Sequence, residues 1–290
     1  MKKIFNGFLV LMAAMSVFAC GDPATPDTPV DDPQTPVGPQ EPVTPGKDFE
    51  SQFEKHIALW EFTGAWCANC PAGYTNMNFL LTTSSRFTDY VHPMAFHSDY
   101  SGTDDLALEG DLTDRIMMDL NIAGLGFPSY MADMYLGGSL VESVNLKEHL
   151  NQIMDENMPY CGVAVSSTVS ETGSAAVTLK LYSEIDAVWR VAVYVVEDKV
   201  KYYQKDGMKE HDSYTHRHVV RRVVSETYRG DRLAKLTADS EAEAKYDIVL
   251  DEAWNLDNTS IYVLALDAEG HVNNMNHCQI NGGTSDYRRK

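Results

Sequence analysis

The residues with the clearest chemistry are two cysteines separated by two positions, Cys67-Ala68-Asn69-Cys70. A close cysteine pair can change between dithiol and disulfide when a thiolate attacks a sulfur atom of a partner. The residues after the pair can form a helix, so we expect Cys67 at a helix N-terminus, where unpaired N–H groups favour a thiolate. Cys67 is therefore expected to be the exposed nucleophile, with a pKa below the roughly 8.5 of a free cysteine. Cys70 is expected to be the more buried resolving thiol, and Pro71 suits the first helical turn because it has no N–H to leave unpaired.

The neighbouring segments must hold this pair between a strand and a helix. Residues 57–62 form an apolar run that leads into a short turn ending in Trp66. A zinc half-site is the alternative, but zinc needs four ligands, usually in two close pairs. Cys161 and Cys278 stand alone in the sequence, so we expect no metal and no cofactor.

These residues resemble the thioredoxin superfamily. The resemblance is carried by Trp66-Cys67-x-x-Cys70 after an apolar strand, by an acid six residues earlier, and by Gly126-Phe127-Pro128-Ser129. It implies an α/β thioredoxin-like domain in which Glu61 accepts and returns the proton of the resolving thiol. It also implies a cis Phe127–Pro128 bond facing the disulfide. In this pattern Pro128 presents backbone to a substrate strand and Trp66 shields the pair.

The bulk composition describes a globular protein with room for two domains. The chain has 290 residues, of which 44% are hydrophobic, and a formal net charge of −19. Nucleic acid needs lysine and arginine to neutralise its phosphates, so this charge argues against a nucleic-acid partner.

Residues 1–19 are predicted to be a secretion signal. Two lysines precede an apolar segment that is too short and wrongly flanked for a membrane span. Ser16-Val17-Phe18-Ala19-Cys20 resembles a bacterial lipobox, which implies a lipoprotein acylated on Cys20. An ordinary signal peptide cut nearby is the alternative. Gly21 stands where an Asp would mark retention in the inner membrane, so the resemblance implies the outer membrane, with the periplasmic or surface side undefined.

Residues 20–47 are predicted to be the lipidated cysteine and a tether. Eight of the twelve prolines lie between Gly21 and Lys47, and the segment has no aromatic residue. Such a composition cannot bury enough surface to fold and favours extended polyproline II. The tether would hold the folded part away from a membrane.

Residues 48–158 are predicted to be the thioredoxin-like domain. A helix after Cys70 is expected to end near Thr82, and an inserted helix and loop around 97–122 accounts for the long separation between Cys67 and Pro128. The other expected elements are strands over 90–96 and 129–136, a helix over 104–120, a short strand between 138 and 145, and a helix from Asn145 with Glu148 completing a capping box.

Residues 159–290 are predicted to be an all-β antiparallel sandwich, with an immunoglobulin-like topology as the working hypothesis. Its expected strands are 162–169, 175–182, 189–196, 219–225, 246–250, 261–266 and 272–280. The segments 189–198, Gln204 and 216–221 are similar to the bacterial outer-membrane lipoproteins of the twenty-eight-kilodalton class. That resemblance implies a thioredoxin-like domain followed by a β domain.

Other clusters have simpler interpretations. His211, His216 and His218 could suggest a metal, but no matching acidic pair or cysteine completes a site, so polar strand surface or a loop hydrogen bond is favoured. The acids at 104–105 and 109–111 lack the spaced loop of a calcium site, so a solvated helix face is favoured. His97 follows the strand 90–96 and is a candidate for the redox face.

Two functions from different classes remain open. The first is an envelope-anchored thiol–disulfide oxidoreductase that acts on protein thiols or disulfides. The second is a non-catalytic, surface-tethered binding or adhesion lipoprotein in which the cysteine pair is structural. Cys161 and Cys278 are either joined by a disulfide or are separate buried thiols, because an oxidising compartment permits both.

The lipobox generates the first prediction. Mass spectrometry of the mature N-terminus should find diacylglycerol on Cys20, and Cys20→Ser should release the protein from membranes. A Cys20→Ser protein that stays firmly membrane-bound would refute the lipid anchor.

Overall fold

The computed structural model describes residues 48–100, 102, 104–122, 126–134 and 142–290. The predicted signal, Cys20, the tether and residues 138–141 of the short strand expected between 138 and 145 lie outside the described residues. The described part of that segment is not a strand, because Ser143–Asn145 forms the 3-10 helix η2. The helices are α1 (Cys70–Thr83), α2 (Leu112–Asp119) and α3 (Leu146–Glu156). The first strands are β1 (Ile57–Thr63), β2 (Val91–His97) and β3 (Ser129–Ala132). No helix among the described residues is both long and apolar enough to cross a membrane.

The remaining strands follow α3 without another α-helix. They are β4 (Cys161–Val169), β5 (Ser174–Ser183), β6 (Ala187–Glu197), β7 (Val200–Asp206), β8 (Lys209–His216), β9 (Val219–Val223), β10 (Asp231–Leu236), β11 (Ser240–Val249), β12 (Thr259–Leu266), β13 (Val272–Gln279) and β14 (Thr284–Ser285). The chain is thus a mixed α/β part followed by a β part, as the sequence predicts.

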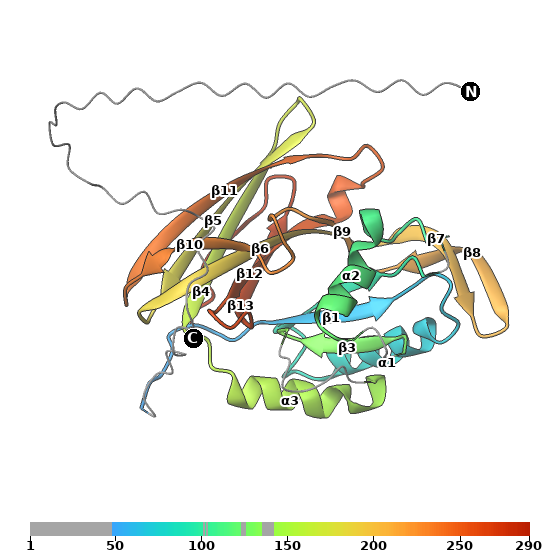
Figure 1. The fold of residues 1–290 in the computed structure, drawn as a ribbon, viewed down its shortest axis with the longest axis horizontal. Helices are drawn as coiled ribbons and strands as arrows, with labels where there is room; N and C mark the ends of the chain where they lie inside the picture. Colours follow the sequence, from blue (N-terminus) through green and yellow to red (C-terminus); the bar gives the residue numbers. More distant parts are fainter. Residues whose placement is uncertain (1–47, 101, 103, 123–125, 135–141) are drawn as a thin grey trace, which may run out of the picture. The chain divides into compact units, whose positions relative to one another are not determined.

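One large sheet runs through both parts (Figure 1). Its order is β13-β12-β6-β9-β2-β1-β3, with β10 paired to β6, and a second sheet has the order β11-β5-β4-β14. The two sheets pack face to face around a core that includes Leu179, Trp189 and Val263. The sandwich is not a closed domain of the immunoglobulin type, because its larger sheet continues through β9 into β2, β1 and β3. The boundary predicted near residue 158 coincides with the end of α3, but strands from both sides of it share this sheet.

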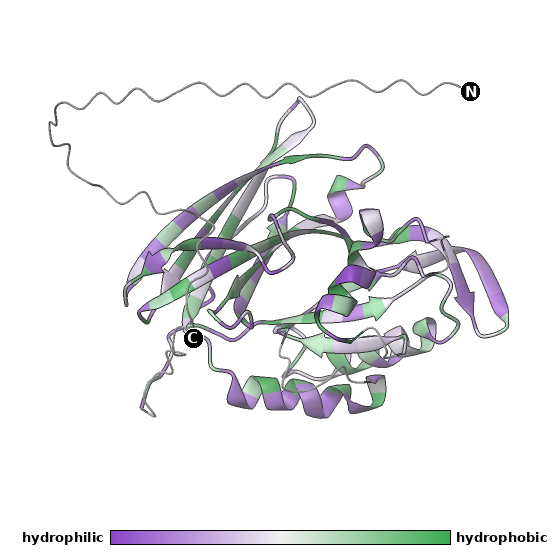
Figure 2. Cartoon of the chain, viewed as in Figure 1, coloured by the Kyte–Doolittle hydropathy of each residue, from purple (hydrophilic) through white to green (hydrophobic). Residues whose placement is uncertain are grey.

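β1 is buried on both of its faces. Side chains alternate along a strand, so Trp60 and Phe62 enter the core under α2, whereas Ile57 and Leu59 enter the core under α1 and α3. Figure 2 shows α3 with a hydrophobic inner side and a hydrophilic outer side, as expected for a helix that covers a sheet. Glu61 has the same parity as Ile57 and Leu59, which directs it beneath α1.

Several predicted elements differ in extent. The helix expected over 104–120 is α-helical only at Leu112–Asp119, because Gly110 and Asp111 have left-handed φ values of 65° and 54°. The strand expected over 129–136 ends at Ala132, since Asp133 has φ 54°. Asn145 caps α3 without a side-chain hydrogen bond, so the expected capping box is not formed. The β part contains β7, β8, β10 and β14 in addition to the seven expected strands.

A buried ion pair ties the end of β3 to the segment that precedes β1. Lys55 Nζ lies 2.7 Å from Asp133 Oδ2, with both side chains largely buried, and it also donates to the carbonyl of Asn273 at 2.6 Å. The other Asp133 oxygen accepts from the Ala58 N–H at 2.9 Å. Burial raises the pKa of Asp133, and Lys55 opposes that rise.

We predict that Asp133→Asn destabilises the fold by about 3–5 kcal/mol, because it leaves the Lys55 ammonium buried without a counter-charge. Asparagine tolerates the left-handed backbone at this position, so the change isolates the lost charge. The double variant Lys55→Met/Asp133→Asn should recover much of this loss. Equal urea denaturation midpoints for the single and double variants would contradict the prediction.

Candidate redox site

The cysteine pair lies where β1 turns into α1. Cys67 precedes the helix and Cys70 is its first residue, and the two form a disulfide with Cα atoms 5.5 Å apart. The turn is closed by the Cys67 N–H, which donates to the Gly64 carbonyl at 3.0 Å. Gly64 is required here, because a Cβ at this position would lie 2.6 Å from Nε1 of the Trp66 indole. The predicted strand-to-helix placement of the pair is therefore present.

Both cysteines are buried in this oxidised state. Cys67 is 5% exposed and Cys70 is 2% exposed. The expectation of an exposed Cys67 is wrong for the oxidised structure, because strand β7, which the sequence analysis did not include, packs against the turn.

Glu61 lies behind the resolving cysteine. It is 3% exposed, and its Oε1 accepts a hydrogen bond from the Tyr130 hydroxyl at 3.3 Å. Burial raises the pKa of Glu61 to about 7, against a smaller lowering by the Tyr130 hydrogen bond. Its carboxyl group can therefore hold or release a proton near neutral pH.

A small cavity joins Glu61 to the pair. Its volume is about 20 Å³, enough for one water molecule. Its lining comes from β1, the start of α1, β2, the β7–β8 hairpin and the residue after β8. The lining residues are Glu61, Thr63, Cys70, Pro71, Tyr74, Ala95, His97, Gln204, Tyr214, Thr215, His216 and Arg217. Cys70 and Glu61 thus share one cavity, which is the arrangement that proton transfer between them requires.

His97 lines the same cavity, in agreement with its predicted place near the redox face. Its Nδ1 lies 2.9 Å from Asp104 Oδ2, and that oxygen also accepts from the Ala65 N–H at 2.6 Å. Burial alone would raise the pKa of Asp104, but His97 and the backbone N–H donors lower it overall. The expectation that Asp104 belongs to a solvated helix face is wrong, because its carboxylate is buried against His97 and the Ala65 N–H. Asp105, Glu109 and Asp111 are exposed, as expected.

Pro128 and Trp66 border the site. The Phe127–Pro128 bond is cis, as the sequence predicts. Pro128 packs on α1, since a Cβ at Gly73 would come within 2.2 Å of Pro128 Cγ. Trp66 donates from Nε1 to the Ser98 carbonyl at 2.8 Å, and its ring lies edge-on to Phe127 at 5.2 Å. Trp66 therefore packs beside the pair.

The β7–β8 hairpin is the part of the site that the sequence analysis missed. The Lys205 N–H donates to the Ala65 carbonyl at 2.8 Å, and the Gly207 N–H donates to the Ala68 carbonyl at 2.9 Å. The dipeptide Asp206-Gly207 is a strong hairpin signal and could have revealed the turn. The flanking strands are largely polar and carry no buried alternation, so they were not recognised.

The histidines at 211, 216 and 218 do not act as one cluster, because His216 lines the cavity beside Glu61 and Cys70 and His211 lies at the surface of the hairpin. His216 is buried, with Nε2 3.1 Å from the Tyr203 carbonyl, whereas His211 is half-buried beside Asp206. Among the described residues, the group whose ligand atoms lie close enough for a metal is Asp267, Glu269 and His271, on the turn before β13.

Cys161 and Cys278 are free thiols in the structure. Cys161 Sγ donates to Asn273 Oδ1 at 3.4 Å inside the sandwich core. Burial raises the pKa of both thiols, that of Cys278 to about 11. Of the two alternatives for these residues, the structure therefore contains separate buried thiols and not the bridge.

The fold and the sequence are similar to those of known proteins. HBP35 of Porphyromonas gingivalis is similar in structure, with a TM-score of 0.66 and 19% sequence identity over 80% of this chain and 77% of that chain. No curated protein matches the sequence. The family model for outer membrane protein Omp28 matches residues 124–283, more than half of the chain.

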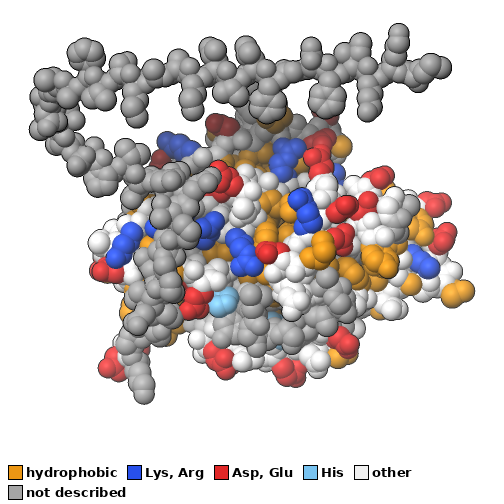
Figure 3. Space-filling model, in the orientation of Figure 1, with side chains coloured by type: hydrophobic (Ala, Val, Ile, Leu, Met, Phe, Trp, Pro, Cys, Tyr) orange, Lys and Arg blue, Asp and Glu red, His pale blue; other side chains and the backbone are white. Residues whose placement is uncertain are grey.

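The protein belongs to the Omp28 outer membrane protein family. Membership supports a location at the cell envelope and its outer membrane. The match begins after the Cys67–Cys70 pair, so it does not bear on the chemistry of the pair. Among the described residues, acidic and basic side chains are interspersed on the face seen in Figure 3.

Burial of Glu61 predicts a pH-dependent stability. Between its ordinary pKa of 4.5 and its folded value of about 7, the unfolded chain ionises Glu61 while the folded chain keeps it protonated. Stability is therefore lost as the pH rises through this window. Glu61→Gln removes the loss, so its stability relative to wild type should rise by on the order of 3 kcal/mol between pH 4 and 8.

Urea denaturation of the oxidised proteins from pH 4 to 8 measures this difference. Glu148→Gln, which changes an exposed carboxylate on α3, is the matched control. A Glu61→Gln curve that runs parallel to that of wild type would show that folding leaves the pKa of Glu61 at its ordinary value, which would contradict the prediction.

Proposed function

We propose that the protein is an envelope-anchored thiol–disulfide oxidoreductase of the thioredoxin-like type that acts on protein disulfides. The observation that supports this most strongly is the shared cavity of Cys70 and Glu61, together with a Glu61 pKa raised to about 7. A structural disulfide needs no titratable group behind it, whereas a resolving thiol must lose a proton before it can attack.

The proposed reaction proceeds in two exchanges. In the reduced protein, the Cys67 thiolate attacks one sulfur of a substrate disulfide, and the other substrate sulfur leaves as a thiolate. Cys70 passes its proton to the Glu61 carboxylate and attacks Cys67 Sγ, which breaks the mixed disulfide and releases the second substrate thiolate. The substrate gains two electrons, the pair loses two, and protonation of the released thiolates completes the balance. The same steps in reverse oxidise a substrate dithiol.

The chain's own groups favour these steps. Cys67 lies just before the first turn of α1, where unpaired N–H groups stabilise a thiolate. The Asp104 carboxylate holds the turn through the Ala65 N–H, which fixes the position of the nucleophile. In the proposal, Pro128 offers backbone to the substrate and Trp66 limits access of solvent, while an acylated Cys20 and the proline-rich segment hold the folded part at the membrane.

The alternative is a non-catalytic, surface-tethered binding or adhesion lipoprotein. The burial of Cys67, at 5% exposure, favours this alternative, because a nucleophile must be reached by its substrate. In this alternative, the Cys67–Cys70 disulfide only stabilises the fold, and the β part contacts the binding partner.

Reduction of insulin disulfides by dithiothreitol, followed by turbidity, separates the two. The mature protein should accelerate the reaction, and Cys67→Ala should abolish the acceleration. Cys70→Ala should retain attack but accumulate a mixed disulfide, detectable by mass spectrometry. Cys278→Ala, which removes a thiol outside the site, is the control and should remain active. A wild-type protein that gives no acceleration, although its pair is reduced by dithiothreitol, would establish the structural role instead.

A further inference from the structure

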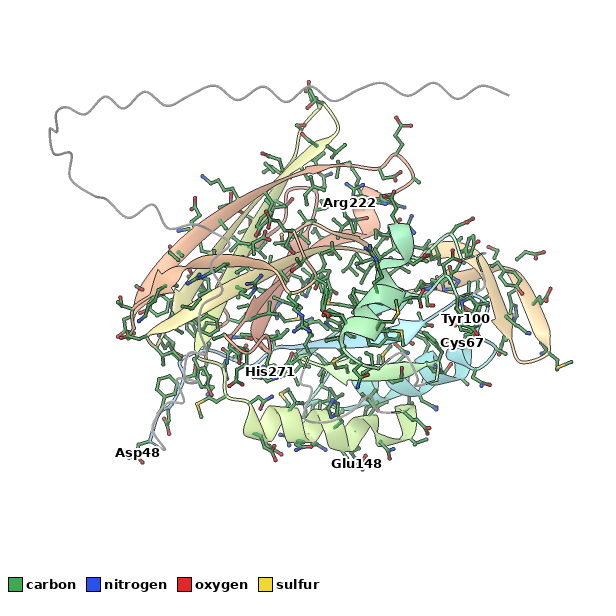
Figure 4. All side chains as sticks on the ribbon, in the orientation of Figure 1. Asp48, Cys67, Tyr100, Glu148, Arg222 and His271 are labelled. Carbon is green, nitrogen blue, oxygen red and sulfur yellow. A yellow bond between two sulfur atoms is a disulfide. The ribbon has the colours of Figure 1, made fainter. Side chains whose placement is uncertain are left out.

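The β7–β8 hairpin holds the redox turn, residues 64–69, through hydrogen bonds from a distant part of the sequence. The Lys205 and Gly207 N–H groups donate to the Ala65 and Ala68 carbonyls, and Gln204 Nε2 donates to the Cys67 carbonyl at 3.0 Å. These acceptors include the nucleophilic residue and lie on both sides of it. In Figure 4, Cys67 lies beside this hairpin at the edge of the molecule.

We call the hydrogen bonds between the hairpin and the redox turn the clamp, and Gln204 is its central contact. It is 2% exposed, although the hairpin around it is largely polar and accessible. Its amide also donates to the Lys205 carbonyl at 2.7 Å, a bond within the hairpin itself. The bonds that this amide makes to the turn, to the Cys67 carbonyl at 3.0 Å and the Gly64 carbonyl at 3.4 Å, form only while the hairpin lies against the turn. A buried amide that loses such partners is destabilising unless water replaces them. The hairpin therefore has two arrangements. In one it lies against the turn with the clamp hydrogen bonds formed, and in the other it lies away from the turn with the Gln204 amide bound to water.

The hairpin can move without breaking the main sheet. β7 and β8 pair only with each other, as a separate two-stranded sheet inserted between β6 and β9. Its two ends are marked by residues with left-handed φ values, Lys199 at 60° and His218 at 55°. An ion pair between Asp198 and Arg217, 2.9 Å long, joins these ends. Elements with few buried apolar contacts are those that open locally at low cost.

We propose that the β7–β8 hairpin is a lid that determines the size of the thiols and disulfides that reach the Cys67–Cys70 pair. With the clamp closed, small dithiols reduce the pair, whereas protein partners require the hairpin to swing away from the turn. Gln204 is the positioning residue that sets this selectivity. The lid rests on the proposed function for its biological meaning. Its effect on access to the Cys67–Cys70 disulfide can be measured from the rate at which reductants reduce that disulfide, without any substrate.

The test compares two reductants of different size on the oxidised mature protein. Dithiothreitol and reduced thioredoxin each give two electrons to the pair, become disulfides themselves and leave Cys67 and Cys70 as thiols. Alkylation and peptide mass spectrometry then give the rate for this pair. Gln204→Ala should raise the rate with thioredoxin about tenfold, the effect of one buried hydrogen bond on an opening equilibrium, and the rate with dithiothreitol by less than about threefold.

Two further variants supply a second test of the clamp and a control. Lys205→Pro removes the N–H that donates to the Ala65 carbonyl and should change selectivity in the same direction as Gln204→Ala. Met208→Ala, at the fully exposed tip of the hairpin, leaves the clamp intact and should match wild type. Hydrogen exchange should be faster at Lys205 and Gly207 in Gln204→Ala, while exchange within β12 is unchanged. This pattern distinguishes an open lid from general unfolding.

Equal acceleration with both reductants, or no acceleration with either, would overturn the lid. These outcomes are independent of insulin turnover. A protein that shows the size selectivity but does not turn over insulin refutes the oxidoreductase and retains the lid. A protein that turns over insulin, but whose rates of reduction by dithiothreitol and thioredoxin do not change in Gln204→Ala, refutes the lid and retains the oxidoreductase.

Discussion

The burial of β1 on both faces is the constraint on which the site depends. All seven residues of this strand are buried, and it is flanked by β2 in parallel and β3 in antiparallel pairing. The two-residue period that sends Trp60 and Phe62 into one core therefore also sends Glu61 into the other, beneath the start of α1. There the carboxyl group has Tyr130 as a hydrogen-bond partner and forms no ion pair with any described residue, so desolvation raises its pKa to about 7. A single strand thus fills the core and supplies a group that can carry protons near neutral pH.

The continuity of the large sheet brings the remaining parts of the site together. β9 extends β2 through the pairing of Ala95 with Val219, and the Ala95 N–H donates to the His218 carbonyl at 2.7 Å. Because β2 lies beside β1, and β1 leads into the redox turn, a hairpin inserted just before β9 emerges next to that turn. Gln204 can therefore reach Cys67 across a separation of 137 residues. The α/β part and the β part, which differ so clearly in sequence pattern, build one site between them.

The sequence was informative where local chemistry dictates structure. The strand before the cysteine pair and the positions of the main β strands follow from apolar runs, and the cis bond at Phe127–Pro128 is the one that the resemblance to the thioredoxin superfamily implies. The long helix expected over 104–120 was wrong, because its spacing of apolar residues does not reveal that Gly110 and Asp111 take left-handed conformations. The burial of Cys67 and of Asp104 could not be predicted either. Both depend on contacts between segments far apart in the chain, and the polar strands of the hairpin carry no hydrophobic pattern to locate it.

The redox turn is held from two sides, and the two sides differ in strength. On the inner side, the Ala65 N–H donates to a buried Asp104 carboxylate that His97 and a second N–H, from Leu106, also contact. Hydrogen bonds to a charged group contribute roughly 1.5–3 kcal/mol, and breaking this one would leave a buried charge short of a partner. On the outer side, the Ala65 and Ala68 carbonyls accept from neutral N–H groups of a largely accessible hairpin, bonds that contribute roughly 0.5–1.5 kcal/mol each and that water can replace. Any opening of the turn must therefore occur on the hairpin side, so the turn keeps its shape, and Cys67 its position before α1, while access to the disulfide changes.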